Sequence, residues 1–236
     1  MNSGTGFEYV ANILPKLIKM IPLTLFVVLV AGISSFFLGV IVTAIRIKKV
    51  KVLFQIISVY VSFMRSTPSL IQLFVVYYGL PIIFKLAGVD IQQWSRTGFA
   101  ILTLVLHNGA YLSEVMRPAY LAVDKGQHDA ADSIGLTRTQ KFFRIICPQV
   151  VPIALPSLGN LLIDLIKDTS ILFTIGVVDL MGKAKLIISN DYGVGQLKVY
   201  VTIAVIYWII SIIAEKGIKA LENKNKKYKF NSVIKV

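Results

Sequence analysis

The run from Leu23 to Ile45 carries no charged residue, and this stretch limits most strongly what the chain can fold into. An α-helix over the run would be about 35 Å long at ~1.5 Å per residue, which exceeds the ~30 Å hydrocarbon core of a bilayer. Comparable apolar runs recur along the chain, and 56% of its 236 residues are hydrophobic. A water-soluble domain of this length does not need such runs to build a core. The sequence therefore predicts an all-α integral membrane protein.

Four further membrane-spanning helices are expected, which makes five in total. The stretch Val52–Leu86 is too long for one straight crossing, and it is interrupted by Met64-Arg65-Ser66-Thr67-Pro68. Because proline removes a backbone donor and clashes with the preceding turn, a kink is expected at Pro68. The fourth crossing contains several Pro and Gly residues, which membrane helices tolerate where they line a cavity enclosed by protein. The expected crossings after the first are Ser69–Phe84, Thr97–Leu121, Ile145–Ile175 and Leu197–Ala214.

The positive charges indicate how the chain is oriented. Four of them follow the first crossing directly, at Arg46, Lys48, Lys49 and Lys51, and lysine and arginine accumulate in cytoplasmic loops. With the N-terminus outside and the C-terminus inside, sixteen of the 25 Lys and Arg residues fall in inside segments and seven outside. The expected organisation is an interfacial segment 1–22, a transmembrane domain 23–215 with a cytoplasmic loop 124–144, and a basic cytoplasmic tail 216–236.

Charge and composition exclude several classes of function. The formal net charge is +13, but the basic residues lie between the crossings rather than on one element, so nucleic-acid binding is not expected. His107, His128 and Cys147 have no partners at metal-ligand spacing, and they offer no nucleophile–base arrangement. The chain also has no Gly-x-x-x-x-Gly-Lys phosphate loop. We therefore expect no metal or cofactor on this chain and no catalysis by it.

Polar residues within the predicted crossings are candidates for a substrate site, because ionisable groups at bilayer depth usually face a bundle interior or an aqueous cavity. Several have a structural alternative. Asp164 and Lys167 could form an internal salt bridge, Glu114 could pair with Arg117, and the residues at the proline break could serve only the kink. The functional interpretation is a cavity that presents both charge signs to a zwitterion. The candidates are Arg65, Thr67, Asn108, Tyr111, Glu114, Asp164, Lys167 and Asp168.

A polar, basic segment from Lys125 to Arg144 separates the third and fourth crossings. Its middle predicts a short helix, with Asp129 near the start, where a negative charge suits the helix dipole, and Gly135 at the end. A small apolar face could contact another protein; a solvated loop helix is the alternative. This face consists of Ala130, Ala131, Ile134 and Leu136.

The order and spacing of these motifs resemble the membrane-spanning permease subunit of ATP-binding-cassette (ABC) importers for polar amino acids, the histidine/glutamine permease-like family. The resemblance covers nearly the whole chain. Three positions depart from the family pattern: Asp129 stands where glutamate is common, Ser66 where glycine is usual, and Pro118 where a small residue is usual. The motifs are Arg65-Ser66-Thr67-Pro68, Gln72-Leu73-Phe74, Gly109-Ala110-Tyr111-Leu112-Ser113-Glu114, Lys125-Gly126-Gln127, Ala130-Ala131, Gly135-Leu136, Pro148-Gln149, Leu158-Gly159-Asn160 and Lys167-Asp168-Thr169-Ser170.

The resemblance implies a type I importer permease in a bacterial cytoplasmic (inner) membrane. It implies transport of a polar or charged amino acid by alternating access. It also implies three partners: an ATPase dimer that carries ATP and Mg²⁺, an extracytoplasmic binding protein, and a second permease chain. We expect the second permease chain to be an identical copy. Glutamine, glutamate, arginine, lysine, histidine and cystine all fit as substrates. The segment 129–136 matches the helix that couples such permeases to the ATPase. The residues of the coupling segment are Gln127, Asp129, Ala130, Ala131, Gly135 and Leu136.

An ion-coupled secondary transporter is the alternative function, since it would also place charges in the membrane. Five crossings without an internal repeat fit that class poorly. Dependence of transport on ATP and on a partner ATPase distinguishes the two.

Overall fold

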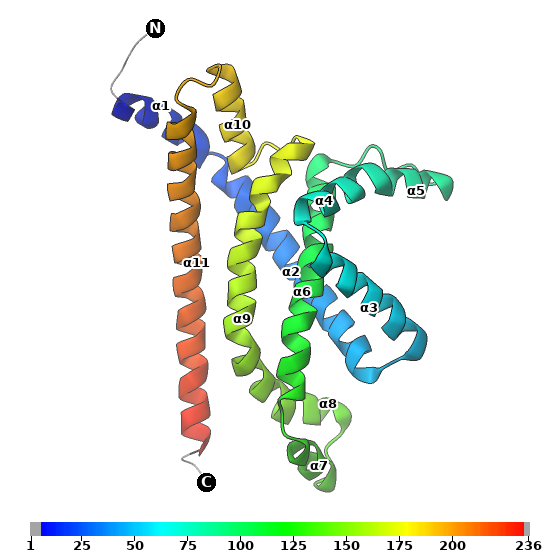
Figure 1. Ribbon diagram of the computed structural model, residues 1–236. Coiled ribbons are helices and arrows are strands. Elements are labelled where there is room, and N and C mark those ends of the chain that lie inside the picture. The colour runs from blue at the N-terminus through cyan, green and yellow to red at the C-terminus, as the bar shows by residue number, and fades with distance from the viewer. Residues whose placement is uncertain (1–5, 234–236) are drawn as a thin grey trace.

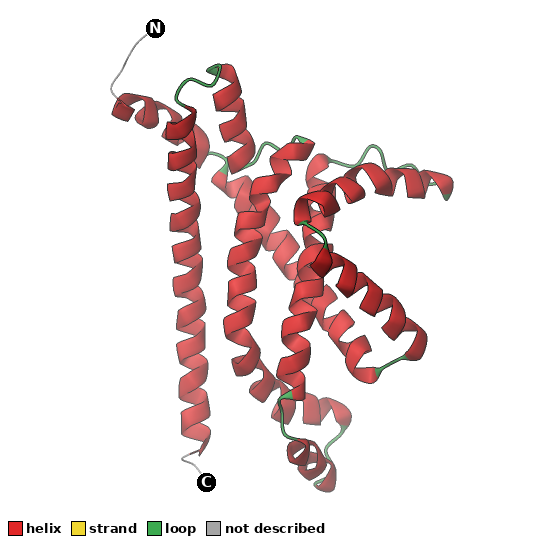
Figure 2. Ribbon diagram, viewed as in Figure 1, coloured by secondary structure: helices red, strands yellow, loops and turns green. Residues whose placement is uncertain are grey.

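The computed structural model describes residues 6–233, with side chains as far as residue 224. Every regular element within these residues is helical (Figure 2). In chain order the elements are α1 (Gly6–Ile18), α2 (Ile21–Lys48), α3 (Lys51–Ser66), α4 (Ser69–Phe74), the π-helical turn η1 (Val75–Gly79), α5 (Leu80–Leu86), α6 (Arg96–Leu121), α7 (Lys125–Ser133), α8 (Arg138–Lys141), the π-helical turn η2 (Phe142–Ile146), α9 (Cys147–Asp168), the 3-10 helix η3 (Thr169–Ile175), α10 (Leu180–Asn190) and α11 (Gln196–Val233).

Five helical runs of the described chain are long and apolar enough to cross a bilayer, which confirms the predicted number of crossings. In Figure 1, α2, α6, α9 and α11 form the body of the molecule, and α3 and the α4–α5 run project from one side. α7 and α8 lie at one end of the body, and α1 and α10 lie at the other. The five runs are Ile21–Lys48, Ser69–Leu86, Arg96–Leu121, Arg138–Ile175 and Gln196–Lys224.

The α2 and α6 helices approach each other closely because glycines face side chains across their contact. A Cβ atom at Gly39 would lie 2.8 Å from Cβ of Leu112, and one at Gly109 would lie 2.7 Å from a methyl group of Leu38. Small residues at helix contacts let membrane helices pack by van der Waals contact, since lipid supplies no hydrophobic drive between them. The core that includes this pair extends to α4, α9 and η3 through buried aliphatic side chains such as Leu73.

The proline break divides the chain where the sequence predicts it. Thr67 and Pro68 adopt extended backbone angles between α3 and α4, as expected for a residue that precedes proline. The fourth crossing, in contrast, continues as one helical run past Pro152 and Pro156. Pro148 also causes no break: it directly follows the π-helical turn η2, and local π adjustments of this kind let membrane helices accommodate proline.

Two regions beyond the crossings are more structured than the sequence suggests. The expected external connection 177–196 contains α10, whose N-cap Asp179 accepts a 2.9 Å hydrogen bond from the Gly182 amide through Oδ1. Burial raises the pKa of the Asp179 carboxyl to about 6. At the other end of the chain, α11 continues without interruption through the expected start of the basic tail at residue 216.

The segment expected at the membrane interface contains α1, which is also attached to the protein. Ile13 and Leu17 are buried in a cluster with Leu180 of α10 and Val199 of α11. The Tyr9 hydroxyl donates a 2.6 Å hydrogen bond to Asp191, and burial together with this carboxylate raises the pKa of Tyr9 to about 12. α1 is therefore a packed element of the fold.

Replacing Gly39 by leucine should force α2 and α6 apart. We expect the free energy of unfolding to fall by about 1–3 kcal/mol, as for other overpacked contacts, in denaturation of the detergent-solubilised protein. Gly217→Leu is the matched control, because a Cβ atom there meets nothing within 4 Å. Equal losses in both variants would contradict the close α2–α6 contact.

Candidate functional site

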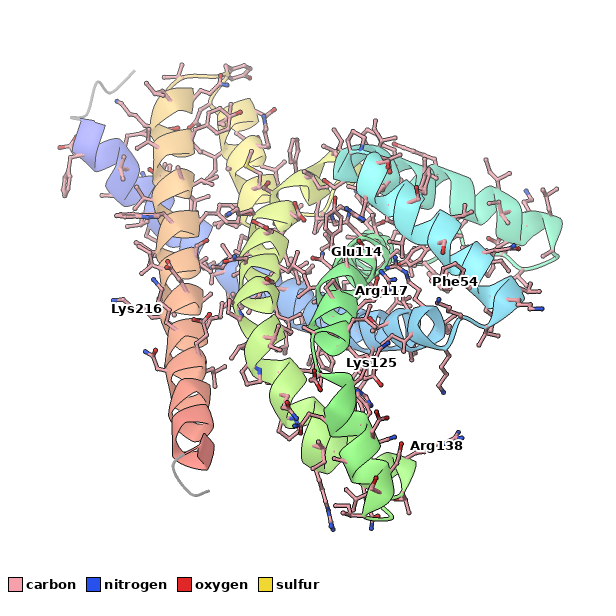
Figure 3. All side chains as sticks on the ribbon, turned by 60° about the horizontal axis from the view of Figure 1, so that its bottom comes forward. Phe54, Glu114, Arg117, Lys125, Arg138 and Lys216 are labelled. Atoms are coloured by element: carbon pink, nitrogen blue, oxygen red, sulfur yellow. The ribbon has the colours of Figure 1, made fainter. Side chains whose placement is uncertain are left out.

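A three-residue ion cluster joins α2, α3 and α6. Arg46 forms a salt bridge with one carboxylate oxygen of Glu114, and Arg65 Nη1 lies 2.6 Å from the other. The salt bridges of the described residues include none between Glu114 and Arg117, so the predicted alternative pairing is wrong. Both residues are labelled on α6 in Figure 3. Arg46, which the sequence identifies only as an orientation signal, is part of this cluster.

A polar cavity of about 330 Å³ opens beside the ion cluster. Serine hydroxyls from α3 share its wall with the charged groups, so it can accommodate a polar molecule or water. Its lining residues are Arg46, Ser58, Val61, Ser62, Arg65, Ser66 and Glu114.

Gln72 compensates the break between α3 and α4. Its side chain is buried, and Nε2 donates to the Met64 carbonyl at 2.8 Å and to the Thr67 carbonyl and hydroxyl at 2.9 Å. Thr67 Oγ1 in turn donates to the Phe63 carbonyl at 2.8 Å. The proline interruption leaves the Met64 and Thr67 carbonyls without a backbone donor. The Gln72 side chain supplies the donors that a continuous helix would have supplied. Thr67, predicted as a substrate contact, is thus occupied in holding the kink.

The same glutamine connects the break to the third and fourth crossings. Gln72 Oε1 lies 2.9 Å from His107 Nδ1, and His107 Nε2 lies 3.9 Å from a carboxylate oxygen of Asp168. The Tyr111 ring lies against the His107 imidazole, with 4.8 Å between centroids. We call Gln72, His107, Tyr111 and Asp168 the polar chain. It brings two predicted site residues, Tyr111 and Asp168, to one place.

Three predicted site residues, Asn108, Asp164 and Lys167, are not joined to the polar chain. Lys167 Nζ pairs with Asp164 at 3.1 Å on the exposed face of α9, which is the salt bridge that the sequence left as an alternative. Asn108 is buried, and its amide donates to the Leu104 carbonyl of its own helix at 3.1 Å. Gln72 and His107 were missed as site residues. Gln72 could have been found because it follows a proline break that leaves carbonyls without donors.

The polar segment between the third and fourth crossings forms α7, and its start was predicted incorrectly. Asp124 is the N-cap, with Oδ1 accepting from the Gly126 amide at 2.7 Å, so Asp129 lies in the middle of the helix. The sequence missed this because Asp124 is separated from the alanines by polar residues that carry no helical periodicity. Gly135 ends the segment at φ +74°, as expected.

Side chains of the predicted apolar face of the α7 segment differ in exposure. Ala131 is buried, whereas Ile134 is 73% exposed beside Gly135. Leu136 donates its amide to the Ala131 carbonyl at 3.1 Å, which closes the turn. Gln127 lies 3.5 Å from Gln149 of α9, so the segment contacts the fourth crossing. Its exposed apolar tip is therefore small and is held by a defined turn.

No group of three or more His, Cys, Asp or Glu side chains in the described residues could hold a metal ion. The geometry instead presents a polar chain and an ion cluster among the crossings, with a helical segment projecting beyond them.

Residues 35–227 match the family described as the binding-protein-dependent transport system inner membrane component. The chain belongs to this family. It is a multi-pass permease subunit of the bacterial inner membrane, and in this family a partner subunit carries the ATPase.

The relatives are similar over nearly the whole chain. The L-cystine transport system permease protein TcyL of Bacillus subtilis is 34% identical over 96% of this chain and 94% of its own length. The probable amino-acid ABC transporter permease protein PatM of Vibrio harveyi is 39% identical over 95% of this chain and 99% of its own length. A crystal structure of an amino acid ABC transporter with histidines matches with a TM-score of 0.79 at 28% identity, covering 95% of this chain and 100% of that one.

Replacing Gln72 by leucine should destabilise the permease by leaving the Met64 and Thr67 carbonyls without their donor. An unsatisfied buried acceptor costs about 1–3 kcal/mol, and we expect a loss of that size in the free energy of unfolding in detergent. Gln55→Leu, at an exposed position of α3, is the control. A Gln72→Leu variant as stable as wild type would show that the break does not depend on this side chain.

Proposed function

We propose that this permease imports a polar or charged amino acid by alternating access, with its N-terminus outside and its C-terminus in the cytoplasm. Two identical copies enclose the pathway, an ATPase dimer binds ATP and Mg²⁺ on the cytoplasmic side, and an extracytoplasmic binding protein delivers the substrate. Membership of the importer family disfavours an ion-coupled secondary transporter.

The observation that best supports this mechanism is the continuity between the α7 segment and the polar chain. The run from Arg138 to Ile175 is helical throughout, and it begins just after the turn at Gly135 and contains Asp168. A continuous helix transmits a displacement of one end to the other as a rigid body. ATP can shift the permease between two states only because the closed ATPase dimer favours one arrangement of this segment.

At the substrate end, the polar chain and the ion cluster offer groups for both ends of a zwitterion. Asp168 can accept from an ammonium group, while Arg65 can bind a carboxylate. The side chain of the transported amino acid is left open, because relatives are named for cystine, nopaline, glutamine and arginine transport. These compounds share a carboxylate and an amino group, which are the features the site is suited to bind.

Gly135→Asp should uncouple transport from ATP hydrolysis. A carboxylate beside Ile134 would charge the apolar tip, so we expect binding-protein-stimulated ATP hydrolysis by the reconstituted complex to fall about ten-fold or more, as for loss of ~1.4 kcal/mol of docking energy. Gly193→Asp is the matched control, because both glycines have a positive φ and open space around them. If both variants lose activity equally, backbone strain rather than docking is responsible.

Asp168→Asn should weaken substrate recognition while the complex still assembles. Loss of a hydrogen bond to a charged group costs about 1.5–3 kcal/mol, so the concentration for half-maximal uptake into proteoliposomes should rise by about ten- to one-hundred-fold. Asp90→Asn, in the loop before α6, is the control. Loss of the co-purifying ATPase in Asp168→Asn would instead mean that Asp168 is structural.

A further inference from the structure

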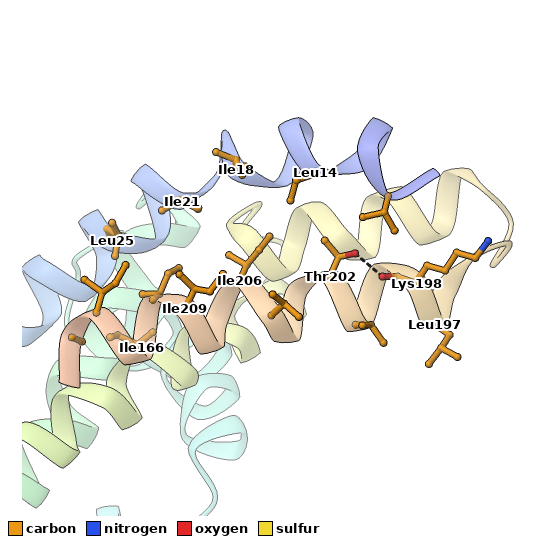
Figure 4. A pocket seen from close by; sticks show the side chains of 16 residues that line it. Leu14, Ile18, Ile21, Leu25, Ile166, Leu197, Lys198, Thr202, Ile206 and Ile209 are labelled. Atoms are coloured by element: carbon orange, nitrogen blue, oxygen red, sulfur yellow. Dashed lines mark hydrogen bonds between the residues drawn. The ribbon is translucent and has the colours of Figure 1, made fainter. Parts of the chain in front are cut away.

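A long apolar groove runs along α11. One wall is α11, and the other is α1 with the first turns of α2 (Figure 4). Its volume is about 1030 Å³, at the upper end of the ~300–1,000 Å³ range of ligand pockets. The groove is therefore large enough for a substantial ligand.

The groove contains almost no polar surface. Leu14 and Ile18 of α1 and Ile206 and Ile209 of α11 are among its aliphatic lining. Thr202 also lines it, but its hydroxyl donates to the Lys198 carbonyl of its own helix at 2.8 Å, drawn as the dashed line in Figure 4. A ligand in the groove must therefore be apolar over the length that the walls contact.

The groove lies along a membrane crossing, and its length is close to the thickness of the bilayer hydrocarbon core. Its lining on α11 extends from Leu197 to Ala214, which is about 25 Å of helix. These residues belong to the fifth crossing, so the groove traverses most of the ~30 Å bilayer core.

A single positive charge marks one end of the groove. Lys198 lines it at the start of the fifth crossing, and Figure 4 shows the Lys198 amine beyond the apolar side chains. The amine lies 5.7 Å from the centroid of the Tyr9 ring. Among the described residues it takes part in no salt bridge. It is thus placed at headgroup depth and available to an anion.

We propose that this groove binds the acyl chains of a phospholipid whose anionic headgroup contacts Lys198. Apolar walls at bilayer depth, with one cation where the headgroups lie, match that molecule in both shape and charge. A second copy of this chain is a poorer match. Contacts between membrane helices favour small residues and interhelical hydrogen bonds, whereas these walls carry branched aliphatic side chains without a spare donor.

The test is native mass spectrometry of the full-length permease, titrated with phosphatidylglycerol and with phosphatidylcholine of the same acyl chains. Wild type should retain the anionic lipid about five-fold more strongly, the preference expected from one lysine at the membrane surface. Lys198→Gln should abolish the headgroup preference but still retain both lipids. Val205→Trp, which fills the groove, should lower retention of both.

Two matched controls should behave as wild type. Lys216→Gln removes an exposed lysine of α11 beyond the groove, and Leu29→Trp enlarges an exposed side chain of α2 outside it. Equal retention of the two lipids by wild type, or an equal effect of the control substitutions, would overturn the proposal. Because Lys198→Gln retains every apolar wall, it remains informative if Val205→Trp does not fold.

A cysteine variant tests whether a second copy occupies the groove. The permease has one cysteine, so Val205→Cys in a Cys147→Ser background carries a single thiol within the groove. Oxidation in the membrane should leave this variant unlinked while lipid retention persists. A disulfide-linked dimer would overturn the proposal, because the second copy would then occupy the groove.

Discussion

The bilayer core contains no water, so each backbone donor and acceptor within it must be satisfied by the protein itself. The break at Thr67 and Pro68 interrupts the helix between α3 and α4, and Gln72 supplies the missing donors. The same side chain reaches His107. The requirement to satisfy a broken helix therefore also places a polar group between the second and third crossings.

The ion cluster shows how charge is arranged around this break. Arg46, Arg65 and Glu114 come from three helices, and one carboxylate serves two guanidinium groups. Removing charges from water is costly, and a pair stabilises a fold only where its geometry is good. Here Arg65 is half exposed, while Arg46 is mostly buried. The cluster therefore holds α3 against the bundle through a contact that an incoming carboxylate could compete for.

The two ends of the fourth crossing relate these features to transport. One end follows the turn at Gly135, and the other end contains Asp168. The prolines within it do not divide it. The proposed coupling relies on this continuous helical connection between the projecting segment and Asp168.

The sequence by itself determined the number of crossings, the break at Pro68, the end of the α7 segment at Gly135 and the family. These depend on local properties: the length of an apolar run, the missing donor of proline and the backbone freedom of glycine. It misplaced the start of α7 at Asp129, because capping by Asp124 depends on one side-chain geometry rather than on periodicity.

Only the tertiary structure decided which polar side chains meet. Glu114 pairs with Arg46 and Arg65 rather than Arg117, and His107 joins Gln72 to Asp168. Spacing along one helix shows which residues share a face, but not which neighbouring helix that face contacts. Ion pairs and hydrogen bonds act over a few ångströms, so the partners of a residue are settled by helix packing that brings together positions far apart in the chain.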